Sequence, residues 1–134
     1  MLQWSSQYET GVTLVDTQHK VLFEHINRLE EMTKRAEIPA QELHRLLSFL
    51  ETYVASHFKF EEQCMHRYHC PSHEANARAH QQFLQAFALL KDEYARVGAT
   101  HAFVGKLFNA ARDWIHSHIL KVDMSLKSAS RVVG

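Results

Sequence analysis

The chain has 134 residues, which is enough for one apolar core and too few for two ordinary domains. Its 15 Lys and Arg residues balance 15 Asp and Glu residues, and this neutrality argues against a groove for nucleic acid or a lasting attraction to an anionic membrane. The chain also lacks a long apolar run, a signal peptide and the many cysteines of a disulfide scaffold, so we expect no transmembrane helix and a reduced, cytoplasmic setting.

Eleven histidines together with only four glycines and two prolines indicate a helical chain and raise the question of a metal site. Residues 1–15 show no long period and contain Trp4 and Tyr8, so we expect an ordered arm that lies over the rest of the molecule. A helix is predicted from about residue 17 to residue 36, with Asp16 as its N-cap, because apolar residues recur there at helical spacing.

Proline positions divide the middle of the chain into two further helices. Pro39 ends the first helix, because proline disfavours helical geometry in the residue before it, and it can itself occupy the first position of the second helix. The second helix should fade between Arg67 and His69. Pro71 then opens the third helix, which is predicted to extend to about Arg96.

Residues 98–100 are predicted to make the last turn, with Thr100 as the N-cap of a fourth helix that reaches at least Val122. Short connections between long amphipathic helices place successive helices antiparallel. The predicted fold is therefore all-α, an antiparallel up-down-up-down four-helix bundle with an ordered N-terminal arm. We expect residues 1–134 to form a single domain, and we consider it a candidate N-terminal input domain of a longer signalling protein.

Antiparallel packing brings the starts of the first and third helices to the end of the bundle where the second and fourth helices finish. Polar side chains able to bind metal reach this level from all four helices: His19, His57, Glu61, Asn76, His80, His118 and Asp123. Burying such groups is costly unless they are paired or bind a metal. Imidazoles with two carboxylates, and no thiolate at the same level, suit iron better than structural zinc.

One candidate pair departs from helical regularity. His118 and Asp123 are five residues apart, about 140° around an ideal helix at roughly 100° per residue. Both side chains reach one cluster only if the helix loosens there, or if Asp123 approaches obliquely as a bridge.

Four motifs, in the same order along the chain, resemble the hemerythrin family. Residues 16–19 (DTQH) resemble the D-x-Q-H opening of the first helix in that family, and residues 57–65 are similar to its H-F-x-x-E-E-x-x-M signature. Residues 71–83 resemble its third-helix segment, and residues 114–123 resemble its W-x-x-x-H-I-x-x-x-D close. Because the four motifs span nearly the whole chain, the resemblance is specific.

The resemblance implies a non-haem di-iron centre, with two Fe ions and an oxo or hydroxo bridge, that binds O2 by passing from a diferrous to a diferric-peroxo state. The implied ligands are Glu61 and Asp123 as bridges, His19 and His57 on the iron that receives O2, and His80 and His118 on the other iron. An apolar pocket that keeps water away from bound O2 is also implied, with the walls Leu22, Phe58, Trp114 and Ile119.

Asn76 stands where the family pattern H-x-x-x-H-x-x-F has its first histidine. An amide is a much poorer donor to iron than an imidazole, and three outcomes are open: Asn76 binds weakly through its oxygen, water fills the position, or His73 substitutes. We expect a weakened or solvent-filled position, and hence faster autoxidation than in Asn76→His. Fast autoxidation suits a sensor better than a carrier. The same autoxidation rate in Asn76→His as in the unaltered chain would contradict this expectation.

Several other polar residues have more ordinary explanations. Glu62 is expected to be a solvated surface acid, with a role as partner of a ligand histidine as the alternative. Cys64 and Cys70 are expected to be buried or idle thiols, with a redox pair as the alternative.

We expect an O2-binding domain that senses O2 or redox state, with O2 and a fused or separate signalling output domain as partners, and not an enzyme. The alternatives are an O2 carrier or storage protein, and a di-iron enzyme acting on peroxide or nitric oxide. Against a ferritin-like enzyme, no Glu in the chain has a His three residues later, the spacing that such sites use. A third alternative is a helical interaction module with zinc or no metal, which the iron content would distinguish.

Overall fold

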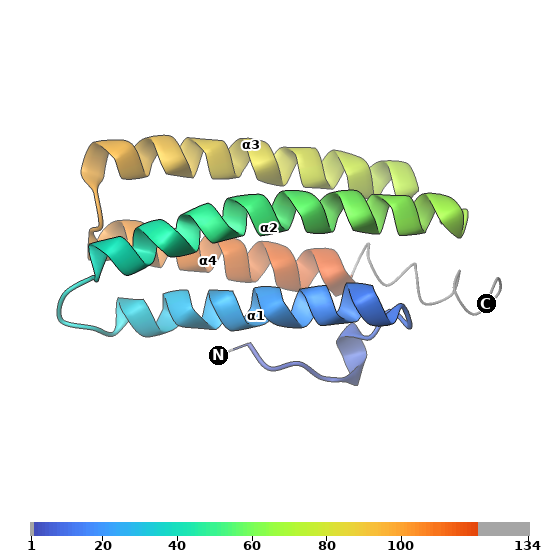
Figure 1. Cartoon of the computed structure of the whole chain (residues 1–134), viewed down its shortest axis with the longest axis horizontal. Helices are drawn as coiled ribbons and strands as arrows, with labels where there is room; N and C mark the ends of the chain where they lie inside the picture. The colour runs from blue at the N-terminus through green and yellow to red at the C-terminus, as the bar shows by residue number, and fades with distance from the viewer. Residues whose placement is uncertain (1, 121–134) are drawn as a thin grey trace.

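In the part of the chain that the structure describes, four long helices pack side by side (Figure 1). The computed structural model describes residues 2–120, which contain α1 (Thr13–Thr33), α2 (Ala40–Arg67), α3 (His73–Val97) and α4 (His101–His118). Successive helices run antiparallel, and α1 and α3 each pack against both α2 and α4. The predicted all-α up-down-up-down bundle is therefore confirmed. Within the described residues, none of the helices has the length and apolar character needed to cross a membrane.

Helix α1 begins before its predicted start, and Asp16 is not its N-cap. The helix begins at Thr13, with Val12 in the cap position. Asp16 lies in the first turn, where its carboxylate accepts hydrogen bonds from the backbone N–H of Thr10 at 2.9 Å and from the Thr10 hydroxyl at 2.8 Å. A carboxylate near a helix N-terminus interacts favourably with the helix dipole, so Asp16 stabilises this end while fastening it to the preceding segment.

Helix α1 ends at Thr33, before its predicted end at about residue 36, and the other helix boundaries lie close to their predicted positions. Pro39 precedes α2 as its N-cap residue, and its carbonyl accepts from the N–H of Leu43 at 2.9 Å. Helix α2 ends at Arg67 as predicted, and α3 begins two residues after Pro71. The predicted cap of α4 is confirmed, because the Thr100 hydroxyl oxygen accepts from the N–H of Phe103 at 3.1 Å.

The backbone loosens directly after α4, which is one of the two alternatives that the spacing of His118 and Asp123 left open. The backbone of Ile119 and Leu120, directly after the helix, widens to π-helical geometry. Such wide turns occur mostly as single turns and often at functional sites. Val122 and Asp123 lie outside the described residues.

The N-terminal arm is ordered and packs on the bundle, as predicted. A 3-10 turn (η1, Ser6–Tyr8) places Tyr8 in the core, 4 % exposed, and its hydroxyl bonds to Nδ1 of His116 in α4 at 2.8 Å. Trp4 packs edge-on against Phe23 of α1 at a ring separation of 5.4 Å. The arm therefore joins α1 to α4 close to the buried polar cluster described below.

The core changes character along the bundle axis. Its half near the α1–α2 and α3–α4 turns is filled by apolar side chains, among them Leu29, Met32, Leu43 and Phe103, each at most 1 % exposed. The other half contains buried His, Asn and Glu side chains. Because apolar burial is the dominant favourable term in folding, the first half mainly supports stability, and the second half is where polar chemistry is built.

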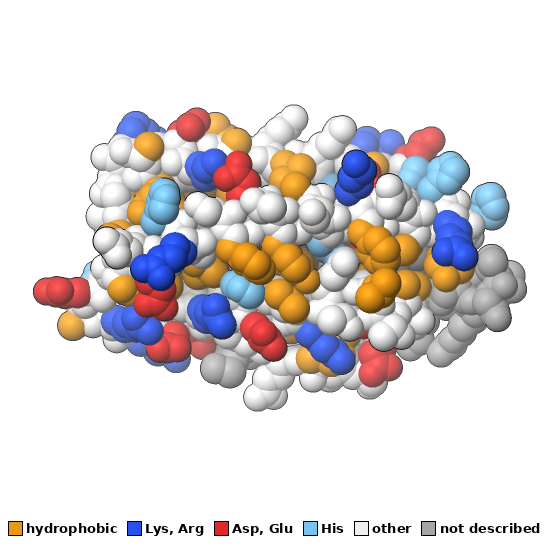
Figure 2. Space-filling view, in the orientation of Figure 1, with side chains coloured by type: hydrophobic (Ala, Val, Ile, Leu, Met, Phe, Trp, Pro, Cys, Tyr) orange, Lys and Arg blue, Asp and Glu red, His pale blue; other side chains and the backbone are white. Residues whose placement is uncertain are grey.

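The surface carries charges of both signs. On the face shown in Figure 2, Lys and Arg side chains are interspersed with Asp and Glu side chains. Two exposed pairs join neighbouring helices, Lys91 with Glu51 at 2.6 Å and Lys106 with Glu93 at 2.7 Å. Exposed pairs of this kind each contribute little to stability, about 0–1 kcal/mol, so they do not explain the packing of the bundle.

Candidate metal centre

Six polar side chains from all four helices meet inside one end of the bundle. They are His19 of α1, His57 and Glu61 of α2, Asn76 and His80 of α3, and His118 of α4, and none is more than 6 % exposed. Helical spacing explains the pairs within α2 and α3, because residues four apart lie on the same face. Six of the seven candidate residues predicted from the sequence are therefore brought together, and Asp123 lies outside the described residues.

Glu61 lies at the centre of this cluster. One carboxylate oxygen, Oε2, is 2.9 Å from Nε2 of His19 and 3.4 Å from Nε2 of His57. The other oxygen, Oε1, is 3.1 Å from Nε2 of His80. Each oxygen of one carboxylate thus faces a different set of imidazoles.

Two opposing effects act on the pKa of Glu61. Burial alone would raise it, because a carboxylate loses its hydration. The hydrogen bonds from His19, His57 and His80 outweigh burial and hold the pKa of Glu61 well below its ordinary value. The buried carboxylate is therefore ionised, which is the state required to bind a cation.

The cluster divides into two groups that are each able to hold a metal ion. The first is His19, His57 and Glu61, and the second is Glu61, His80 and His118, with the ligand atoms of each group within 4.8 Å of one another. Two imidazoles with one carboxylate form a well-known arrangement for non-haem iron that leaves coordination positions open. Because Glu61 belongs to both groups, the described residues form a paired site with one shared carboxylate.

Two side chains outside the cluster orient its histidines. Nδ1 of His57 is 2.7 Å from Oε1 of Gln18, and Nδ1 of His80 is 2.9 Å from Oε2 of Glu62. A carboxylate only accepts hydrogen bonds, so the Nδ1–H of His80 donates to Glu62 and its Nε2 faces Glu61. Contacts of this kind fix ring orientation and increase ligand basicity in metal sites.

The sequence predicts the roles of Glu62 and Gln18 unequally well. The prediction that Glu62 is only a solvated surface acid is wrong, because its Oε2 lies 2.9 Å from Nδ1 of His80. This is the contact that the alternative prediction required, while the role of His80 as a metal ligand stays a prediction. The sequence alone predicts no role for Gln18, because its position relative to His57 depends on the packing of α1 on α2. Its place in the DTQH motif, directly before His19, was the available signal.

Asn76 forms hydrogen bonds with two members of the second group, His118 and Glu61. Its Oδ1 is 2.6 Å from Nε2 of His118, and its Nδ2 donates to Oε1 of Glu61 at 3.1 Å. His73 belongs to neither of the metal-competent groups among the described residues. Its ring instead lies 5.5 Å from that of His66, so at this position it is Asn76 that faces the cluster.

Aromatic rings hold two of the cluster's histidines in place. Phe58 stacks on His80 with ring centroids 3.8 Å apart and planes at 3°, and Trp114 stacks on His118 at 4.4 Å and 16°. These contacts restrict rotation of both imidazoles. They also place the two aromatic side chains between the cluster and the apolar core.

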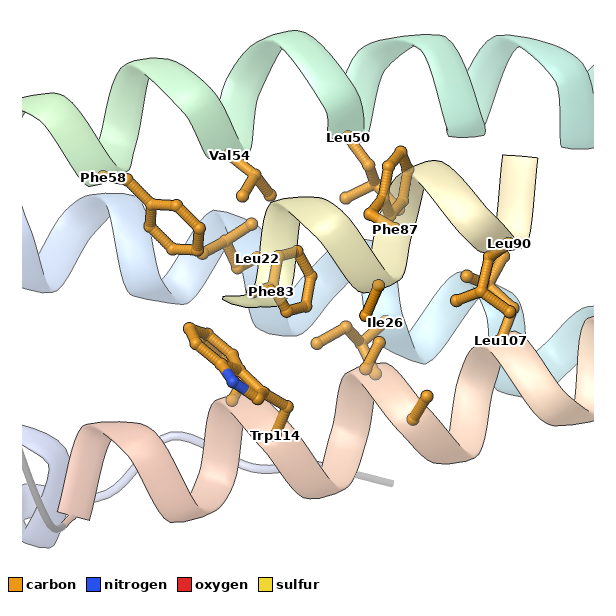
Figure 3. Close-up of a pocket in the computed structure, with 14 residues that line it drawn as sticks. Leu22, Ile26, Leu50, Val54, Phe58, Phe83, Phe87, Leu90, Leu107 and Trp114 are labelled. Carbon is orange, nitrogen blue, oxygen red and sulfur yellow. The ribbon is translucent and has the colours of Figure 1, made fainter. Parts of the chain in front are cut away.

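An apolar cavity of about 100 Å³ begins at these aromatic side chains and continues along the core. Figure 3 shows Leu22, Phe58 and Trp114 around one end of it, and Leu90 and Leu107 at the other. These first three are pocket residues predicted from the sequence. The fourth, Ile119, is fully buried but does not line this cavity, which Ile115 lines instead. A cavity with such a lining favours small apolar molecules over water.

Comparison with known proteins identifies the family. The family model for the hemerythrin HHE cation binding domain matches residues 10–129. The chain belongs to this hemerythrin family. The family prediction made from the four motifs is thereby confirmed.

Relatives that match over most of their length agree with this assignment. A bacteriohemerythrin from Methylococcus capsulatus (strain ATCC 33009 / NCIMB 11132 / Bath) is 30% identical over 128 residues, which cover 92% of each chain. A bacteriohemerythrin from Pseudomonas aeruginosa (strain LESB58) is 29% identical over 131 residues, covering 97% of this chain and 82% of the relative. A crystal structure of wild-type hemerythrin matches with a TM-score of 0.80 at 26% identity, covering 96% of this chain and 97% of that one.

The donor chemistry of the hemerythrin-family cluster fits a cation of the iron type. Its ligand atoms are imidazole nitrogens and carboxylate oxygens, and neither metal-competent group contains a thiolate. Cys64 lies one turn beyond Glu61, where burial and the Glu61 charge raise the pKa of its thiol. Because only the thiolate is a metal ligand, the described residues favour an N/O-liganded metal over a thiolate-bound zinc.

Proposed function

We propose that this domain holds two Fe ions with an oxo or hydroxo bridge and binds O2 reversibly. The observation that carries the proposal is the pair of two-histidine groups that share the buried Glu61. When bound, the two irons supply the two electrons that O2 accepts. The matching family and the bacteriohemerythrin relatives support this function.

The protein residues would divide the work as follows. His19 and His57 would hold the iron that receives O2, His80 and His118 would hold the other iron, and Glu61 would be shared between the two. Asp123, outside the described residues, would supply the second carboxylate. Gln18 and Glu62 hold the rings of two of these histidines through Nδ1.

The apolar cavity supports O2 as the ligand. Its lining is aliphatic and aromatic, so it excludes water and the protons that water would deliver. Leu22, Phe58 and Trp114 line this cavity, Phe58 and Trp114 also stack on His80 and His118, and Ile119 is buried. A cavity of this kind next to the cluster would hold a small apolar molecule more readily than an ion.

We further propose that the domain acts in the cytoplasm as an O2 or redox sensor rather than as a carrier or an enzyme. The supporting observation is Asn76, which faces the second group where the family pattern has an imidazole. A centre with one weaker ligand is expected to lose reversible O2 binding sooner, which suits signalling to an output domain. The same feature makes a di-iron enzyme acting on peroxide or nitric oxide the second candidate, and turnover assays separate the two.

A visible spectrum of the reduced, iron-loaded protein, recorded without O2 and again after air is admitted, tests the proposal. We expect about two irons per chain and a new charge-transfer band that disappears when O2 is removed. His57→Asn should abolish the band, and His44→Asn, at an exposed position of the same helix, should leave it intact. Two bound irons without such a band would overturn O2 binding, and absence of iron would overturn the centre itself.

A further inference from the structure

The two halves of the cluster offer equal numbers of protein ligands. Each has two imidazoles and one oxygen of Glu61, and a third imidazole is lacking where Asn76 faces the second half. We infer that the metal held by His80 and His118 keeps a position open to an exogenous ligand, so that the centre takes two small ligands, one on each metal. This inference rests on the proposed di-iron function and deepens it.

Asn76 is poorly suited to close that position. Its side chain is shorter than histidine, and its amide is held at both ends, by His118 at Oδ1 and by Glu61 at Nδ2. A neutral amide oxygen is also a weak ligand for iron compared with imidazole. When Nε2 of His118 binds a metal it carries no proton, and Oδ1 of Asn76 is then an acceptor for a water that occupies the open position.

The neighbouring side chains do not move in to replace the missing imidazole. His80 and His118 are held by their stacks with Phe58 and Trp114. Glu62 is engaged with Nδ1 of His80, and His73 packs against His66 instead of entering the cluster. The described residues around the second half therefore supply two imidazoles and no third strong donor.

The size and burial of the site limit the ligand to a few atoms. Asn76 is 0 % exposed and His80 is 1 % exposed, so a ligand must fit within the packed core. Suitable ligands are small anions or diatomic molecules that donate one atom to a metal. Such a ligand would displace the water next to Asn76.

Azide titration of the oxidised, iron-loaded protein tests this inference, with iron measured in the same samples. We expect about two azides per two irons in the unaltered chain, and one in Asn76→His, where the added imidazole closes the second position. Asn109→His introduces a histidine at an exposed position of α4 and should retain both azides. Asn76→Asp preserves side-chain size, supplies an anionic oxygen, and should weaken the second azide at least tenfold.

The outcomes separate the inference from the function on which it rests. Two irons with a single azide in the unaltered chain would overturn the inference and leave the proposed function standing. The same azide count in the unaltered chain and in Asn76→His would also overturn it. A chain that fails to take up two irons would overturn the proposed function and the inference together.

Discussion

The two halves of the cluster have the same number of imidazoles but different support. On one half, Nδ1 of His57 faces the neutral amide of Gln18 at 2.7 Å. On the other half, Nδ1 of His80 faces the carboxylate of Glu62 at 2.9 Å. A carboxylate partner increases the basicity of a ligand imidazole more than a neutral partner does. The half that carries Asn76 in place of an imidazole therefore has the more strongly supported histidine.

This difference shows how one buried carboxylate can be shared by two unequal groups of imidazoles. Both oxygens of Glu61 are used, one toward each half. In the proposed centre, Asn76 in place of an imidazole would weaken only the second half, and the charge on Glu62 would act on that same half. The halves are thus separable by mutation, except at Glu61.

The largest effect is expected from Glu61→Gln, which should remove both metals. The substitution leaves a neutral side chain between three imidazoles and removes the one charge that both groups share. We expect the iron content to fall from about two per chain to near zero, measured after loading and desalting. Glu51→Gln, an exposed carboxylate on the same helix, provides the control and should retain both metals. Retention of one tightly bound iron in Glu61→Gln would show that the halves do not depend on a shared carboxylate.

The second largest effect is expected from Gln18 and Glu62, the side chains that contact Nδ1 of His57 and His80. Their loss should lower metal affinity by different amounts in the two halves of the cluster. Loss of a carboxylate behind a ligand histidine typically lowers metal affinity about 10- to 100-fold. Glu62→Gln should therefore weaken the metal on the His80 half by about that factor, whereas Gln18→Leu, which removes only a neutral contact, should have a smaller effect on the other half. Competitive chelator titrations resolve the two affinities. If the two variants lose affinity equally, the charge of Glu62 is not what distinguishes the halves.

The contrast between the halves also indicates what a sequence can reveal about such a site. Residues four apart on one helix share a face, so His57 with Glu61, and Asn76 with His80, were paired from spacing alone. The antiparallel order then placed both pairs at one end of the bundle. The position of these side chains at one end of the bundle therefore follows from helical periodicity and helix order, and both can be predicted from the sequence.

The contacts around the ligands depend on rotation and tilt of the helices, which spacing does not encode. Gln18 reaches His57 across the α1–α2 interface, and Glu62 reaches His80 across the α2–α3 interface. Glu62 follows Glu61 directly, and on an isolated helix it points away from the Glu61 face. The start of α1 was mistaken for a similar reason, because Asp16 bonds to Thr10 of a segment without periodicity.

The smallest effect is expected at the apolar end of the bundle. It tests whether the stability of that end is independent of metal binding at the other end. The Thr100 hydroxyl caps α4 by accepting from the N–H of Phe103, at the end of the bundle remote from His118. Loss of such a cap costs about 1 kcal/mol, so Thr100→Ala should lower the free energy of unfolding of the metal-free protein by about that amount, as measured by urea denaturation. Thr100→Ser, which keeps the hydroxyl, should restore most of it.

Metal affinity should not change in Thr100→Ala, because the capped turn touches neither half of the cluster. The same chelator titration used for Glu62 and Gln18 measures this. If affinity on the His118 half falls together with stability, the start and the end of α4 are coupled through the helix. The support of the second metal would then extend along the whole of α4, and the difference between the halves would not be explained by Glu62 and Asn76 alone.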